Sequence, residues 1–166
     1  MQTHKVAAIT MALIALAACS SGHKTTVVTN GGTVTTDTSA DSKTTTITSQ
    51  GASLKVGENA VDPAKLGLPL YPGASTAEGG GWAMQSKNGG GEIVTLTTTD
   101  SFDSVEAWYK SKMPANSESI NMKSGDTASA IFAVGKDTDK EQRSVMINGE
   151  KGKTTITLTH SVKQGS

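Results

Sequence analysis

The sequence of 166 residues holds one cysteine, only two each of Trp, Tyr and Phe, and no net charge. A single cysteine excludes an intramolecular disulfide, and no CxxC pair exists that would bind zinc or exchange disulfides. Lys and Arg total 15, as do Asp and Glu, and neither sign forms a run of five, so the charges indicate no nucleic-acid partner. Because aromatic residues are scarce, we expect a modest core of aliphatic side chains.

Residues 1–18 have the layout of a secretory signal peptide. A polar head with one lysine, residues 1–5, precedes an apolar run, residues 6–18, which only Thr10 interrupts. This run is shorter than the roughly 20 residues that span a bilayer, but it fits the apolar region of a signal peptide. The alternative is an amphipathic or buried first helix. We disfavour it because no polar face recurs at helical spacing.

The only cysteine follows this apolar run directly. Leu16-Ala17-Ala18-Cys19 resembles the lipobox of bacterial lipoproteins. The resemblance implies cleavage before Cys19, a diacylglyceryl thioether on its sulfur and acylation of the new amino terminus. A thiolate is the side-chain nucleophile best suited to such alkylation, and several acyl chains anchor a protein stably where one chain binds only marginally. We therefore expect Cys19 to be a lipid attachment site that joins the chain to a membrane.

The residue after the cysteine bears on the compartment. In Gram-negative members of the lipoprotein family this residue determines sorting, and Ser20 resembles the residue found in outer-membrane lipoproteins. The resemblance implies a cell-envelope protein that is lipid-anchored at the outer membrane, with its folded domain in the periplasm.

Residues 19–53 are rich in threonine and poor in apolar mass. Between positions 25 and 48, eleven of 24 residues are Thr, and Phe, Tyr, Trp, Leu and Met are absent. This composition predicts a flexible tether, because the segment buries too little to offset the entropy of ordering. The alternative is β-structure, since β-forming residues flank two hairpin signals, Asn30-Gly31-Gly32 and Gln50-Gly51. Such hairpins would be marginal unless they joined the main sheet, and residues 44–57 are the better candidate for order.

Residues 54–163 carry the pattern of one small α+β domain, followed by a tail of residues 164–166. Residues 81–100 read as two strands joined by glycines, and residues 101–114 read as a helix that Pro114 stops. We expect Asp103 to cap this helix, with Glu106 closing a capping box. Apolar residues at helical spacing predict its buried face, namely Val105, Trp108, Tyr109 and Met113.

Period-2 alternation returns after the helix and ends in a last hairpin around residues 148–152. The predicted fold class is therefore α+β, an antiparallel sheet with one amphipathic helix packed on a face.

Two short motifs in this domain resemble a signature of uncharacterised bacterial envelope lipoproteins. They are Tyr71-Pro72-Gly73-Ala74 and Trp108-Tyr109-Lys110, and the resemblance covers roughly residues 54–162. It implies a turn followed by strands, a helix and more strands, and it implies no activity.

Histidine chemistry has little support in the domain. His160 is the only histidine of residues 54–163, and it alternates with Ile156 and Leu158. This register predicts a residue on a sheet face and not a general base. No GxSxG motif is present, and no histidine-based triad can be assembled without His160.

Two other kinds of motif, a calcium loop and a phosphate loop, lack the residues that their function requires at the right spacing. The acidic stretch DTDKE at 137–141 resembles the start of a calcium loop, but Gln142 and Asn148 stand where an EF-hand needs Gly and Glu. The glycine triplets at 79–81 and 89–91 precede neither Lys-Ser/Thr nor a helix, so they read as hairpin ends and not as phosphate loops. We therefore predict no catalytic residue, no metal site and no cofactor, and hence a protein that is not an enzyme.

Tyr71 and Trp82 are the candidate ligand contacts, because aromatic faces bind sugars and apolar side chains well. Trp108 is better explained as core beneath the helix, whereas glycines flank Trp82 and favour its exposure. We expect a lipid-anchored envelope protein that acts as a binding or structural module, with an envelope protein or peptidoglycan as partner. The alternatives are a dedicated glycan- or peptide-binding module, or an envelope hydrolase, for which the required constellation is lacking.

Overall fold

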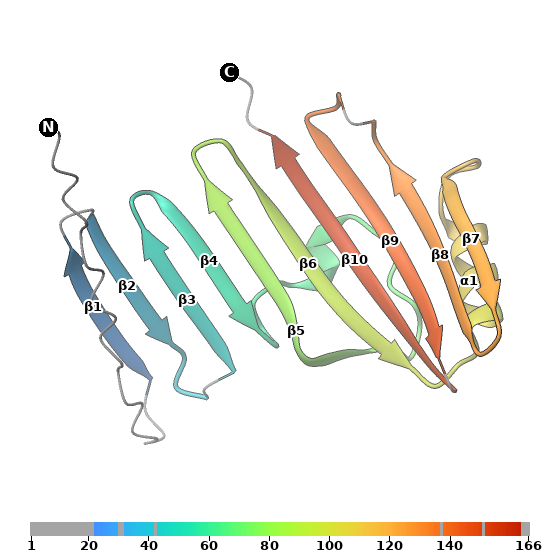
Figure 1. Cartoon of the computed structure of the whole chain (residues 1–166), viewed down its shortest axis with the longest axis horizontal. Coiled ribbons are helices and arrows are strands. Elements are labelled where there is room, and N and C mark those ends of the chain that lie inside the picture. The colour runs from blue at the N-terminus through green and yellow to red at the C-terminus, as the bar shows by residue number, and fades with distance from the viewer. Residues whose placement is uncertain (1–21, 30–31, 42, 137, 151, 164–166) are drawn as a thin grey trace, which may run out of the picture.

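The computed structural model describes residues 22–29, 32–41, 43–136, 138–150 and 152–163. Ten strands form one antiparallel sheet in the order β1-β2-β3-β4-β5-β6-β10-β9-β8-β7 (Figure 1). The strands are β1 (His23–Thr29), β2 (Gly32–Thr38), β3 (Thr44–Ser49), β4 (Ala52–Gly57), β5 (Ser75–Ser86), β6 (Gly89–Thr98), β7 (Glu118–Ser124), β8 (Thr127–Val134), β9 (Glu141–Glu150) and β10 (Lys153–Lys163). The helices are α1 (Phe102–Lys112) and the short 3-10 helix η1 (Pro63–Leu66).

The predicted fold class, α+β, is wrong. Over the residues that the structure describes, the protein is mostly a ten-stranded antiparallel sheet with one α-helix, 61% strand and 11% helical. The difference arises in the threonine-rich residues 19–53, where composition favoured a tether and where described residues instead form β1, β2, β3 and the start of β4. These strands extend the sheet from β5, so their backbone groups gain partners that an isolated hairpin could not supply.

The hairpin of β3 and β4 turns where the sequence predicts it. Gln50 and Gly51 have φ of 46° and 81°, the two positive values that a type I′ turn requires. The turn matches the right-handed twist of the flanking strands and sets their register, in which Ser49 pairs with Ala52. Of the first hairpin signal, Asn30 and Gly31 lie outside the described residues.

The core lies between one face of the sheet and a layer made of α1 and residues 58–74. The sheet contributes inward-facing aliphatic residues from its central strands, including Val94, Val145, Ile147, Ile156 and Leu158, all fully buried. Burying each such side chain contributes about 1.5–3 kcal/mol. The covering layer adds a second set, including Leu66, Leu68, Tyr71, Val105 and Tyr109.

The helix begins two residues earlier than its predicted cap. Ser101 is the N-cap, and its hydroxyl accepts a hydrogen bond from the Ser104 N–H at 3.3 Å. The prediction of Asp103 as cap is wrong; Asp103 lies in the first turn, where its charge still suits the helix dipole. The predicted buried face is confirmed for Val105, Tyr109 and Met113, and Trp108 is half-buried against the same core.

Substitution of Gly57 tests whether β3 and β4 are fixed in the sheet. A Cβ at Gly57 would lie 1.8 Å from the Lys43 carbonyl oxygen, whereas a Cβ at Gly73 meets nothing within 4 Å, and both residues have positive φ. We expect Gly73→Ala to cost about 1–2 kcal/mol from backbone strain. Gly57→Ala should cost about 3 kcal/mol or more, because backbone must shift as well.

Guanidinium unfolding followed by far-UV circular dichroism measures both costs. If β3 and β4 were not held in the sheet, Gly57→Ala would be nearly neutral, so an unfolding free energy equal to that of the parent protein would contradict the strand assignment.

Candidate functional site

Among the residues that the structure describes, one face of the sheet carries no helix. The helix α1 packs against β8, β9 and β10, and η1 packs against β10, both on the far side of the sheet in Figure 1. We call the near side of the sheet in this view the uncovered face and the other side the α1 face. Because side chains alternate along a strand, the register assigns each paired residue to one of these faces.

Apolar side chains lie on the uncovered face in every strand from β1 to β6, with a diagonal step between β2 and β3, where Val34 pairs with Ser49 and Ile47 with Thr36. The register places these residues opposite one another in steps: Val27 with Val34, Ile47 with Leu54, Leu54 with Met84, Val56 with Trp82, and Trp82 with Ile93. We call these eight residues the apolar stripe. Val27, Val56 and Met84 are 42%, 37% and 47% exposed, and the other five are half-buried by their neighbours.

Charge is segregated to the opposite side of the same strands. Among the paired residues of β1–β6, the charged ones are Lys24, Asp37, Lys55 and Glu92. Each of them alternates onto the α1 face. The uncovered face of these strands therefore presents threonine hydroxyls and apolar groups without a formal charge from Lys, Arg, Asp or Glu.

The buried side of the sheet changes at β5. In β6 and β8–β10 the apolar residues of the core point to the α1 face, as Val94 and Leu158 do, whereas Ile93, Ile131 and Met146 point to the uncovered face. In β3 and β4 the apolar residues Ile47 and Leu54 point to the uncovered face, while Thr46 and Lys55 take the α1 face. Because the side-chain period is two, this inversion leaves the first half of the sheet with an apolar face that α1 cannot cover.

The structure separates the two aromatic residues predicted to contact a ligand. Tyr71 is buried on the α1 side, where its ring meets Trp108 edge-on at 5.3 Å and its hydroxyl donates to Asp100 at 2.7 Å. That hydrogen bond raises the pKa of the Tyr71 hydroxyl. Trp82 lies half-buried on the uncovered face, between Val56 and Ile93. The two residues lie on opposite faces of the sheet and do not form one site.

His160 lies in a charged cluster at the end of the central strands. Its Nε2 lies 2.7 Å from Glu141 and its Nδ1 lies 3.5 Å from Glu92. Arg143 contacts Glu141 at 2.5 Å and donates from Nε to the Leu66 carbonyl at 3.0 Å. The cluster thereby ties the ends of β6, β9 and β10 to η1.

A hollow of about 200 Å³ opens beside His160 and Glu92. It is lined further by Gln85, residues 89–91 and Val162, so its described lining brings no hydroxyl or thiol nucleophile. Both ring nitrogens of His160 face carboxylates, Nδ1 facing Glu92 and Nε2 facing Glu141. The arrangement suits a structural ion-pair cluster better than general-base catalysis, which needs an available ring nitrogen.

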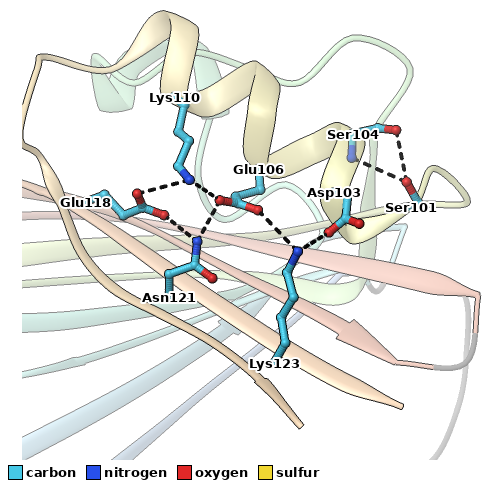
Figure 2. Close-up of polar contacts among 8 residues, drawn as sticks. All are labelled: Ser101, Asp103, Ser104, Glu106, Lys110, Glu118, Asn121 and Lys123. Carbon is cyan, nitrogen blue, oxygen red and sulfur yellow. Dashed lines mark hydrogen bonds and ion pairs between the residues drawn. The ribbon is translucent and has the colours of Figure 1, made fainter. Parts of the chain in front are cut away.

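A second charged cluster joins α1 to the edge strand β7 (Figure 2). Glu106 is 7% exposed, forms an ion pair with Lys110 and accepts a hydrogen bond from Asn121 at 2.7 Å. Lys110 also reaches Glu118 at 3.2 Å, and these two carboxylates raise the pKa of Lys110. The groups bind one another, so the cluster fastens the helix to β7.

Several sequence-based expectations fall on residues that the structure does not describe. These are the signal peptide at 1–18, Cys19, Ser20, Asp137 of the acidic stretch and the tail at 164–166. Within the described ranges, no group of three or more His, Cys, Asp or Glu is arranged to hold a metal ion. None of the helices described is long and apolar enough to cross a bilayer.

Comparisons with protein-family models, with curated proteins and with solved structures found no match to this chain.

Sequence reasoning missed most of the apolar stripe. It singled out Trp82 and passed over Ile47, Leu54 and Val56, because composition alone gives no pairing partner for residues 44–57. The alternation of threonine or serine with aliphatic residues in that segment was the available signal. Only the pairing with β5 shows that these residues share a face with Trp82.

Truncation of Glu106 tests the cluster between α1 and β7. We expect Glu106→Ala to cost about 1–3 kcal/mol, because it leaves Lys110 and Asn121 without a buried partner. Asp103→Ala removes the ion pair with Lys123, in which the two side chains are 74% and 53% exposed, and should cost less than about 1 kcal/mol. Urea unfolding of both variants measures the difference, and equal costs would contradict the assignment.

Acid unfolding tests the cluster at His160. Hydrogen bonding from His160, with help from Arg143, lowers the pKa of Glu141 below its ordinary 4.5. A lowered folded-state pKa contributes stability above pH 4.5 that is lost as the pH falls through the folded value. We expect Glu141→Gln to be less stable than the parent near neutral pH and to lose less stability on acidification. Melting temperatures of the parent protein and of Glu141→Gln, measured as a function of pH, check this expectation. If the two curves run parallel, the proposed contribution of Glu141 is contradicted.

Proposed function

We propose that this protein is a lipid-anchored, non-catalytic protein of the cell envelope, and that the uncovered face is its contact surface. The observation that carries the anchor is the position of Cys19. It ends the apolar run of a signal peptide and stands four residues before His23, where the sheet begins. Ser20 favours the outer membrane, with the sheet in the periplasm.

The proposed anchor has a geometric consequence. Four residues span at most about 14 Å when fully extended, so lipid on Cys19 would hold β1 close to the membrane surface. No long spacer separates the two, because the threonine-rich residues that composition assigned to a tether form β1–β4. We therefore propose that the edge strand β1 lies next to the membrane surface.

The contact surface follows from the apolar stripe. Exposed apolar groups gathered on one face mark interaction sites, and Trp82 adds an aromatic ring of the kind that interfaces favour. A binding or structural role is preferred to hydrolysis because both ring nitrogens of His160 face carboxylates. The partners proposed are other proteins or peptidoglycan of the envelope.

The intact mass of the protein recovered from membranes tests the anchor. We expect a chain that begins at Cys19 and carries the mass of a diacylglyceryl group plus one acyl chain. The Cys19→Ala variant should keep residues 1–18 attached or be cleaved elsewhere, and should carry no lipid. An unmodified mass for the parent protein would overturn the proposed function.

A further inference from the structure

We propose that the uncovered face is occupied by a second copy of this chain, packed face to face so that two apolar stripes form the inner layer of a β-sandwich. This proposal rests on the contact surface of the proposed function and names its partner. It does not require the lipid on Cys19.

The first support is the size of the face. Six strands at a spacing of about 4.8 Å are about 24 Å across, and strands of six residues are about 20 Å long. Two such faces together bury on the order of 1,000 Å², which is the lower bound for a specific interface. A contact limited to the tryptophan or to one hairpin would fall well below that bound.

The second support is that none of the paired residues on this side of β1–β6 is a Lys, Arg, Asp or Glu. A two-fold interface brings each patch against its own copy, so a charged patch would meet like charge. Lys24, Asp37, Lys55 and Glu92 all lie on the α1 face, and the threonines between the apolar residues are neutral. Two copies of the uncovered face can therefore pack together without charge repulsion. A face that bound an anionic membrane would instead carry lysines.

The third support is the geometry of sheet packing. Two sheets pack about 10 Å apart with aligned strands, and their inner faces alternate apolar residues with the outward polar ones. The stripe supplies that pattern on one side, and the α1 face of β3 and β4, with Thr46 and Lys55, supplies the polar outside. The inversion of polarity at β5 then has a physical reason, because each half of the sheet buries its apolar side against a different layer.

Paired substitutions on β5 give the sharpest test. Met84 lies in the stripe and is 47% exposed, so Met84→Lys is accommodated in a monomer. Gln85, the next residue, is exposed and points to the α1 face, so Gln85→Lys adds the same charge on the other side. Leu54→Lys and Ser53→Lys repeat the comparison on β4. Far-UV circular dichroism and thermal melting establish that each variant is folded.

The oligomeric state is measured by native mass spectrometry of the mature protein released from detergent micelles, and by sedimentation at about 10 μM. We expect the parent protein, Gln85→Lys and Ser53→Lys to be dimers. Met84→Lys and Leu54→Lys should raise the dissociation constant by more than about 100-fold, because each places two ammonium groups in an apolar interface.

Three results would overturn the proposal. One is a monomeric parent protein, including one that instead binds phosphatidylglycerol vesicles or peptidoglycan fragments. Another is a dimer that survives both stripe substitutions, which would place the contact elsewhere, such as the edge of β1. The third is a dimer that dissociates to the same extent in a stripe variant and in its control, for example in Met84→Lys and in Gln85→Lys. The same spectra report acylation, so a lipid-modified monomer refutes only the dimer, whereas an unmodified chain refutes the anchor whatever its oligomeric state.

Discussion

The pairing of β5 with β4 on one side and β6 on the other is the interaction on which the rest of the sheet depends. Strand β6 belongs to the half of the sheet that α1 and residues 58–74 order by apolar packing. Strands β1–β4 have no core of their own among the described residues, and two hairpins alone would be marginal in water. Because the backbone ladder continues through β5, the packed half orders the unpacked half.

That continuity also determines what each face of the sheet presents. The register carries the alternation of β4 onto β5, where Leu54 pairs with Met84 and Val56 with Trp82. The apolar residues of the first half therefore gather opposite α1 and are left in contact with solvent. This apolar face is suited to contact with another molecule. The two charged clusters, around Glu106 and His160, instead join helices to strands within the protein. The proposed anchor at Cys19 would place this surface beside the membrane.

Part of the fold was predictable because it depends on local spacing. The helix and its buried face follow from the 3.6-residue period of residues such as Val105 and Tyr109, and the turn at Gln50-Gly51 follows from local backbone preference. The fold class was wrong because apolar content was used to judge order in residues 19–53. The backbone hydrogen bonds that hold these strands in the sheet do not depend on side-chain type, so composition cannot predict them. The placement of Tyr71 and Trp82 on opposite faces has the same origin, since local sequence shows neither pairing partner.

By itself, the sequence determined the alternation within each strand, the position of the helix, the turn residues and the isolation of Cys19 at the end of an apolar run. These are properties of spacing and residue type over a few positions. Only the tertiary structure decided that β10 lies between β6 and β9, that β4 joins β5, and that one apolar face is buried while the other is not. The physical reason is that a period of two defines two faces, and only long-range pairing determines which of them meets the helix.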